Sequence, residues 1–106
     1  MKVIYVAGKY TGKSEWEIYN NIHHARLVAH RLWGEGWAII CPHANTAFFG
    51  GPETHDIDRM KWLNGDLEIL SRCDAIYMLL GWECSLGAKQ EYAVARKLGK
   101  KIYFED

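Results

Sequence analysis

The sequence predicts an α/β fold, a three-layer sandwich around a sheet of four parallel strands. Short apolar runs rich in β-branched residues alternate with longer segments of helical periodicity, which is typical of a parallel sheet with right-handed crossovers. The run at residues 74–80 is continuously apolar, as expected of a strand covered by helices on both faces. A chain of 106 residues, 49% of them hydrophobic, can bury one core but hardly two, so we expect residues 1–106 to form one domain.

The first strand is predicted at residues 2–7, where a short β-rich run ends at Gly8. A helix should follow from Ser14, because residues 14–17 form a capping box in which the Ser14 hydroxyl and the Glu17 carboxylate satisfy free N–H groups. It is expected to run to about Trp33, with Gly34 and Gly36 ending it. Its expected buried stripe is Ile18, Ile22, Ala25, Ala29 and Leu32.

Three further strands and two further helices complete the expected order. Residues 37–41 read as a strand that Pro42 stops, and a long loop follows to about residue 55. A helix is expected at 57–71, a strand at 74–80, a helix from near Ser85 to Gly99, and a last strand at 101–104. The predicted architecture is therefore Rossmann-like or flavodoxin-like.

The expected topology alone predicts where a binding site should lie. In open parallel sheets, ligands bind beyond the carboxyl ends of the strands, where the chain turns into the next helix. The segments that meet this condition are residues 8–14, 42–58 and 81–91.

Composition narrows the classes of partner. Lys plus Arg equals Asp plus Glu at 13 each, so the broad attraction to a nucleic-acid backbone is missing and no polymer partner is expected. No apolar run approaches a membrane span, and the N-terminus lacks the layout of a signal peptide, so a cytoplasmic protein without membrane contact is expected. The three cysteines are expected to be reduced thiols.

Neither a metal site nor a cofactor is expected. The donors that a zinc site would need are Cys41, His43, His55 and Cys84, and their spacing matches no recognised zinc motif. Residues 8–14 (GKYTGKS) resemble a P-loop, but only three residues separate the glycines instead of four. A glycine turn before a capped helix explains this segment. We favour a turn that also brings the backbone of Gly8, Lys9 and Tyr10 near a sugar or phosphate.

The segment 81–91 (GWECSLGAKQE) is the most informative in the chain. Ser85 is a natural N-cap, and the free N–H groups after it form a small anion site. Gly87 costs about 1 kcal/mol relative to Ala within a helix, so a functional reason for it is worth seeking. Gly87 and Glu91 are four residues apart on one helix face, so the missing side chain opens space before the Glu91 carboxylate. A surface glutamate and a packing glycine are the alternative explanation from spacing alone.

Three motifs together resemble the nucleoside 2-deoxyribosyltransferase superfamily, including its small phage and bacterial members of unknown function. They are residues 4–8 (IYVAG), residues 64–67 (NGDL) leading to 73–76 (CDAI), and residues 85–93 (SLGAKQEYA). The likeness spans most of the chain in the correct order, and the last motif is the most specific. The resemblance implies cleavage or exchange of an N-glycosidic bond.

The resemblance also implies roles for individual residues. Glu91 would be the nucleophile that forms a covalent glycosyl-enzyme, Tyr5 would orient Glu91, and Asp66 would help protonate the departing base. At the position that matches Ser85, the nucleoside transferases carry an acid, whereas the nucleoside 5′-monophosphate N-glycosidases carry serine. In this respect the chain resembles the N-glycosidases. A 5′-phosphate is therefore expected there, with Lys9 or Lys13 nearby.

The remaining assignments stay open between alternatives. His43 or Asn45 is expected to touch the sugar or base, and Trp82 or Tyr10 to offer a stacking face, although a buried capping histidine and an interface tryptophan explain them equally well. Phe48 and Phe49 could close over a base or pack against a partner subunit. The chain stops two residues after the last strand, whereas better-known members have a C-terminal extension that reaches the neighbouring subunit.

The expected function is N-glycosidic bond cleavage or base exchange on a (deoxy)nucleoside 5′-monophosphate by a homo-oligomer, a dimer or larger. The alternatives are a module that binds or sequesters a nucleotide without turnover and, more weakly, a purely interacting domain.

Overall fold

The computed structural model describes residues 1–45 and 57–106, and its centre is a parallel sheet. The strands are β1 (Val3–Ala7), β2 (Ala38–Ile40), β3 (Ala75–Met78) and β4 (Lys101–Phe104), in the order β2-β1-β3-β4. All three pairings are parallel, so the carboxyl ends of the strands share one edge. Because β1 lies between β2 and β3, the chain leaves β1 toward one side and later returns on the other, which opens a crevice at that edge.

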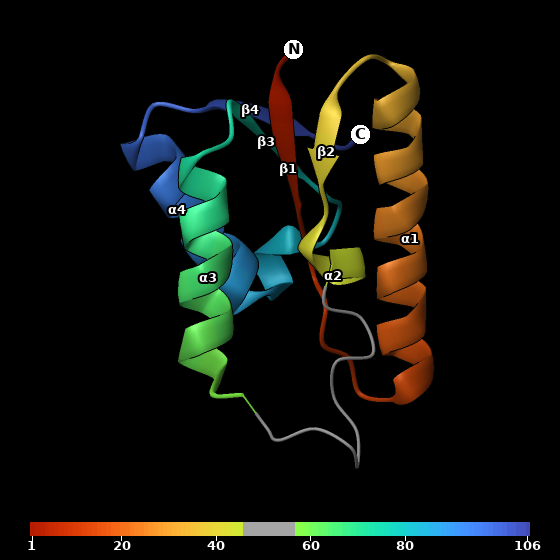
Figure 1. Cartoon of the computed structure of the whole chain (residues 1–106). Helices are drawn as coiled ribbons and strands as arrows, with labels where there is room; N and C mark the ends of the chain where they lie inside the picture. Colours follow the sequence, from red (N-terminus) through yellow and green to blue (C-terminus); the bar gives the residue numbers. More distant parts are fainter. Residues whose placement is uncertain (46–56) are drawn as a thin grey trace.

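The helices cover both faces of the sheet (Figure 1). They are α1 (Glu15–Gly34), α2 (Pro42–Asn45), α3 (Arg59–Ser71) and α4 (Leu86–Lys97), with a 3₁₀ turn η1 (Trp82–Cys84) before α4. Helix α1 lies on one face, and α3 and α4 lie together on the other (Figure 1). The predicted three-layer α/β sandwich is therefore confirmed. A helix forms in each segment where one was predicted, and its bounds differ from the expected ones by a few residues.

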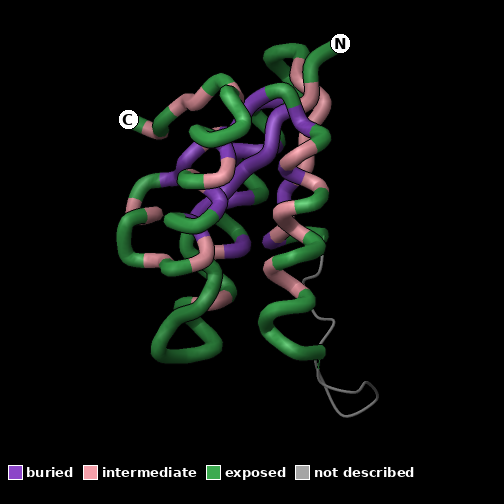
Figure 2. Tube along the Cα trace, turned by 90° about the vertical axis from the view of Figure 1, so that its left-hand side faces the viewer, coloured by how far each residue is buried: buried purple, intermediate pink, exposed green. Residues whose placement is uncertain are grey.

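Strand β1 divides the core because successive side chains of a strand point to opposite faces. Ile4 and Val6 pack with the buried stripe of α1, whereas Tyr5 and Ala7 pack with residues of α3 and α4. All four are at most 1% exposed. Burial is concentrated in the strands and the inner helix faces (Figure 2). One face of β1 thus serves packing alone, while the other also carries the tyrosine predicted to be functional.

Three local predictions need correction. The chain forms the short helix α2 immediately after β2, where a loop was expected, because Pro42 has the fixed φ that suits a first helical position. Ser14 caps α1 as expected, but Glu17 accepts from the Lys13 N–H instead of closing the capping box on Ser14. On α1, Val28 is buried and Ile18 is only half-buried.

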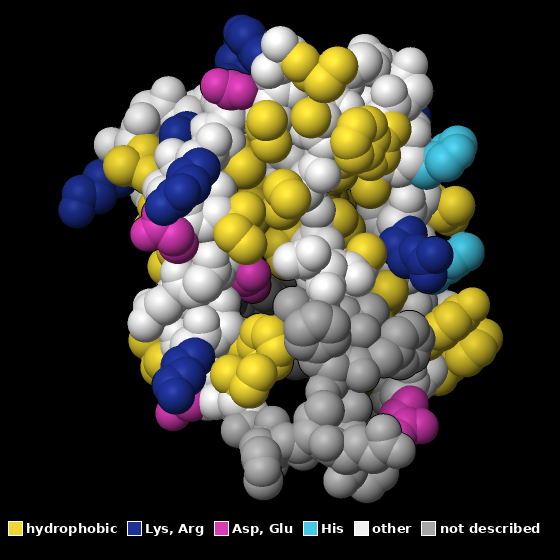
Figure 3. Space-filling view, viewed as in Figure 1, with side chains coloured by type: hydrophobic (Ala, Val, Ile, Leu, Met, Phe, Trp, Pro, Cys, Tyr) yellow, Lys and Arg dark blue, Asp and Glu magenta, His cyan; other side chains and the backbone are white. Residues whose placement is uncertain are grey.

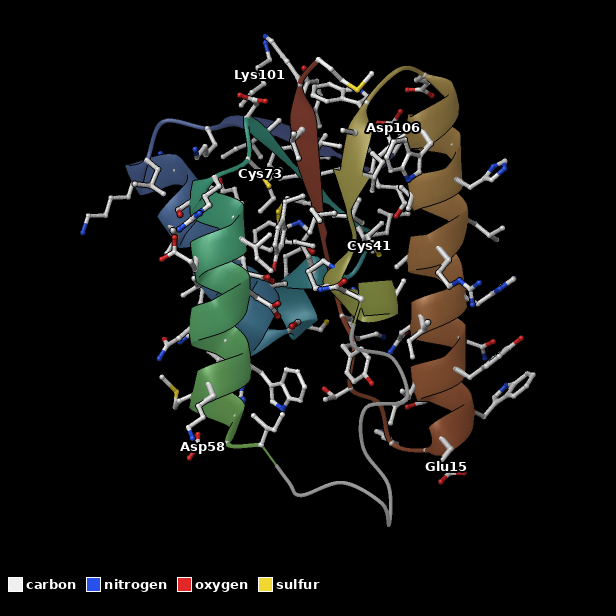
Figure 4. The ribbon with its side chains drawn as sticks, viewed as in Figure 1. Glu15, Cys41, Asp58, Cys73, Lys101 and Asp106 are labelled. Atoms are coloured by element: carbon white, nitrogen blue, oxygen red, sulfur yellow. The ribbon has the colours of Figure 1, made fainter. Side chains whose placement is uncertain are left out.

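The cysteines are free thiols, as expected. Cys41 follows β2 and Cys73 follows α3, and the two lie apart in Figure 4. Within residues 1–45 and 57–106, no three His, Cys, Asp or Glu side chains gather to hold a metal ion. His55, one donor of the zinc alternative, lies outside the described residues, as do Phe48 and Phe49. In the same described ranges no helix has the length and hydrophobicity needed to cross a membrane.

Candidate active site

A cavity of about 680 Å³ lies at the carboxyl edge of the sheet. Its size falls in the usual range of small-molecule sites, about 300–1,000 Å³. The segments after β1, β2 and β3 all contribute to its wall, as the topology predicts, and α3 and α4 supply the rest. Figure 3 shows a hollow with an acidic side chain at its rim, below a group of hydrophobic side chains between α3 and α1.

Glu91 lines this cavity, and Tyr5 contacts Glu91 from the buried core behind the wall. The Tyr5 hydroxyl donates a hydrogen bond to Glu91 Oε2, although the two residues are 86 positions apart. Tyr5 is fully buried and Glu91 is 8% exposed. Because burial and the Glu91 charge both raise the pKa of Tyr5, the phenol stays protonated and remains a donor. The hydrogen bond occupies Oε2 and fixes the orientation of the carboxyl group, which leaves Oε1 available to a ligand.

The electrostatic environment of Glu91 is unusual for a glutamate. Burial raises its pKa to about 7, the hydrogen bond from Tyr5 opposes that rise, and the charge of Asp66 adds to it. Burial also raises the pKa of Asp66, which lines the same cavity from α3. Paired acids with raised pKa values in a cavity are typical of sites that both transfer protons and attack carbon.

One face of α3 forms a side of the cavity. Arg59, Trp62, Leu63 and Asp66 all line it. Their spacing is i, i+3, i+4 and i+7, which places them on a single helix face. Of these four residues, the sequence indicated only Asp66, through the resemblance. The periodic spacing could have indicated the other three, with an acid among apolar positions as the signal that this face meets a polar ligand.

The start of α4 also lines the cavity. The Ser85 hydroxyl caps the helix by accepting from the Ala88 N–H at 3.1 Å. Gly87 lines the cavity, and a Cβ built on it would meet only Ser85 Oγ, at 3.9 Å. The glycine is therefore not required by packing within the described residues. Its lack of a side chain leaves room in the cavity in front of Glu91.

Polar side chains hold the loop after β1 in place. Asn21 donates to the carbonyl oxygens of Tyr10 and Thr11 at 3.0 and 3.3 Å, and His43 Nε2 lies 2.9 Å from the carbonyl oxygen of Lys9. These contacts bring Tyr10 and Thr11 into the cavity wall before any ligand arrives.

Packing requires a glycine at position 8, which also lines the cavity. A Cβ at this position would lie 2.7 Å from Leu79 Cδ1 and 2.8 Å from Leu79 Cβ, so the chain can turn here only without a side chain. Gly8 also lines the cavity, so its backbone is accessible to a ligand.

Three residues predicted to bind substrate lie outside this cavity wall. The Lys9 side chain is exposed, and the Lys9 carbonyl oxygen accepts a hydrogen bond from His43 Nε2. Asn45 is also exposed and borders a separate shallow hollow beside α1. Trp82 packs in an aromatic cluster, with ring centroids 4.7 Å from Tyr92 and 6.2 Å from Phe104. Of the two predicted stacking faces, the structure therefore brings Tyr10 to the cavity and not Trp82.

Comparisons with known proteins agree with this architecture. Residues 2–104 match the model of a family described as a domain of unknown function, DUF4406. No curated protein matches the chain significantly. Among solved structures, the chain is similar to a 2-deoxyribosyltransferase from Bacillus psychrosaccharolyticus, with 21% identity and a TM-score of 0.66, over 96% of this chain and 70% of that one.

A second solved structure, a 2-deoxyribosyltransferase from Leishmania mexicana, gives 21% identity and a TM-score of 0.68. The match covers 98% of this chain and spans 63% of the length of the Leishmania protein. At these identities the likeness shows a common fold. The fold that the resemblance implies is confirmed, because the chain shares it with both 2-deoxyribosyltransferases.

Proposed function

Because the chain belongs to the DUF4406 family, whose description leaves its function open, we propose an activity from the cavity itself: cleavage or exchange of the N-glycosidic bond of a (deoxy)nucleoside 5′-monophosphate. The observation that carries this proposal is the Glu91 carboxyl group, which lines a cavity large enough for a nucleotide and is held from behind by the buried Tyr5 hydroxyl. The shared fold of the two 2-deoxyribosyltransferases supports glycosyl transfer as the general class.

In the first step, Oε1 of Glu91 attacks the anomeric carbon while the bond from that carbon to the base nitrogen breaks. The electron pair of the broken bond goes to the base, whose nitrogen takes a proton from Asp66. The raised pKa of Asp66 supports this role, because it favours the protonated acid. Tyr5 holds the other carboxyl oxygen and keeps Glu91 in the orientation for attack. The product is a glycosyl ester of Glu91 and a free base.

In the second step, the ester is opened by an incoming nucleophile. Water gives hydrolysis, and the nitrogen of a second base gives exchange. The new bond forms at the anomeric carbon, the ester bond breaks to restore the Glu91 carboxylate, and the nucleophile's proton returns to Asp66. Two displacements at the same carbon retain its configuration.

The start of α4 and the start of α3 support a 5′-phosphate on the substrate. The N-terminal N–H groups of α4 and the positive end of its helix dipole favour an anion, and the Ser85 cap adds no negative charge. Arg59 is the sole Lys or Arg among the described residues of the cavity wall, and it occupies the first position of α3, where a cation opposes the helix dipole. A bound phosphate would offset that cost.

Activity is tested by incubating the protein with a panel of ribo- and 2′-deoxyribonucleoside 5′-monophosphates and measuring the release of free base by chromatography. We expect release by the unmodified protein and loss of at least a hundredfold in Glu91→Gln, with binding of the same nucleotide preserved. Binding without release by the unmodified protein would instead establish a module that sequesters nucleotides. Absence of both release and binding would overturn the proposal.

The phosphate is tested at Ser85. Ser85→Asp keeps an effective helix cap but adds a negative charge, so it should reduce activity on the monophosphate much more than activity on the nucleoside. Ser85→Asn is the matched neutral cap and should preserve the preference for the monophosphate. Equal effects of the two variants on both substrates would remove the phosphate from this position.

We also propose that the protein forms a homo-oligomer, a dimer or larger. Light scattering coupled to size-exclusion chromatography measures the mass in solution, and a monomer at micromolar concentration would rule it out.

A further inference from the structure

His43 stands out among the cavity residues because one of its ring nitrogens is unsatisfied. The side chain is 5% exposed and lines the cavity, with its ring edge-on to Tyr10 at a centroid distance of 5.6 Å. Its Nδ1 atom is buried and has no hydrogen-bond partner among the residues that the structure describes. Leaving a buried polar atom unpaired is costly, so such an atom in a binding cavity calls for an explanation.

The other ring nitrogen determines the tautomer. Nε2 lies 2.9 Å from the carbonyl oxygen of Lys9, and a carbonyl can only accept, so Nε2 carries the proton. Burial lowers the pKa of His43, which favours the neutral ring. Nδ1 is therefore held as an unprotonated acceptor, and the position of the ring is fixed by its bond to the loop after β1.

We propose that His43 Nδ1 accepts a hydrogen bond from the nucleotide, from either a sugar hydroxyl or an N–H group of the base. This inference rests on the proposed function and adds a specificity-determining residue to it. Among the uncharged side chains of the described cavity wall, His43 is nearly completely buried and has an acceptor atom, Nδ1, without a hydrogen-bond partner. A ligand group that can only accept would leave Nδ1 unpaired on binding and is disfavoured at this position.

Two variants separate the acceptor from the contact with Lys9. In His43→Gln, the terminal amide reaches the place of Nε2 and can still donate to the Lys9 carbonyl, but the acceptor at Nδ1 is gone. In His43→Asn, the amide oxygen lies near the place of Nδ1, but the contact with Lys9 is lost. A purely structural role predicts that Asn is the more damaging change, whereas the proposal predicts that Gln is.

Dissociation constants are measured by calorimetry in the Glu91→Gln background, where turnover is blocked. The probes are the common ribo- and 2′-deoxyribonucleoside 5′-monophosphates together with ribose 5-phosphate and 2-deoxyribose 5-phosphate, which carry hydroxyls but no base. We expect His43→Gln to weaken the tightest-binding nucleotide about tenfold and His43→Asn to weaken it by much less. An equal loss for the sugar phosphates assigns the donor to the sugar, and no loss for them assigns it to the base.

The outcomes distinguish failure of this inference from failure of the proposed function. If nucleotides bind and the unmodified protein releases base, but His43→Gln binds every probe as the unmodified residue does, Nδ1 makes no ligand contact and only this inference is overturned. The same holds if Asn is as damaging as Gln. If no probe binds and no base is released, both fail together.

A second measurement covers the case in which neither variant folds. Ring ¹⁵N resonances of His43 in the Glu91→Gln protein should show an unprotonated Nδ1, and its shift should move when the nucleotide is added. A protonated Nδ1, or a resonance that does not respond to bound nucleotide, would overturn the proposal.

Discussion

Replacing Glu91 with Gln should make the protein more stable above pH 7 while removing its activity. The substitution is nearly isosteric, and the amide oxygen can still accept the hydrogen bond from Tyr5. What changes is the charge, because the folded protein buries a carboxylate at high pH and Gln never ionises. The cost of that buried charge is set by the difference between the pKa of Glu91 in the folded and unfolded chains.

The magnitude follows from linkage between ionisation and folding. The pKa of Glu91 is about 7 in the folded protein against an ordinary 4.5. Below pH 4.5 the group is protonated in both states and contributes nothing to the pH dependence. Between pH 4.5 and about 7 the folded state binds more protons, so stability falls as pH rises. At about 1.4 kcal/mol per tenfold change, the total loss is about 3 kcal/mol, complete above pH 7.

The assay is urea unfolding of the unmodified protein and of Glu91→Gln at pH 5 and pH 8. Because part of the loss has already occurred at pH 5, the stability difference between the two proteins should shift in favour of Gln by about 2.5 kcal/mol from pH 5 to pH 8. Glu83→Gln is the control, since it makes the same chemical change at an exposed side chain in η1, where water solvates the charge in both states. A difference between Glu91→Gln and the unmodified protein that is the same at both pH values would refute the reasoning.

Three further substitutions test the cavity and its support. Gly87→Ala should raise the free energy of unfolding by about 0.5–1 kcal/mol, seen as a Tm a few degrees higher, because its Cβ meets open space in the free protein. The same Cβ should weaken nucleotide binding, and unchanged affinity would contradict this. Asp66→Asn removes the proposed proton donor, so kcat should fall; it also removes a charge that adds to the rise in the pKa of Glu91, so the acid limb of the remaining kcat/KM should move to lower pH. An unmoved limb would mean that the two acids are not coupled. Gly8→Ala should cost about 1–3 kcal/mol by denaturant unfolding because its Cβ would lie 2.7 Å from Leu79 Cδ1, and a neutral effect would show that Leu79 gives way freely.

The sheet and its carboxyl-edge site could be predicted because they depend on signals that repeat along the chain. Alternating strand and helix patterns leave few topologies, and a parallel sheet then determines which turns meet. Helix α2 could not be predicted in this way, because four residues are too few to show a period. Its role in carrying His43 into the cavity was visible only as a polar residue after a strand.

The direction of individual side chains was harder to predict than the elements that carry them. Trp82 follows β3 at the right edge, but the 3₁₀ turn directs its ring toward Tyr92 and Phe104, where apolar contact outweighs exposure to the cavity. Asp66 was found only through the resemblance. Its place among apolar residues on the inner face of α3 was readable from the spacing, but spacing alone does not separate a cavity from a core.

The span of 86 residues between the two partners of the buried carboxyl contact has a consequence for how the protein matures. Under the proposed mechanism, a nascent chain whose last helix has not left the ribosome has the tyrosine but lacks the acid, so it would not react with a nucleotide. Turnover would therefore require the last helix to be folded against the first strand. A nucleotide that binds only the finished fold should protect the first strand and the final helix from proteolysis to the same degree.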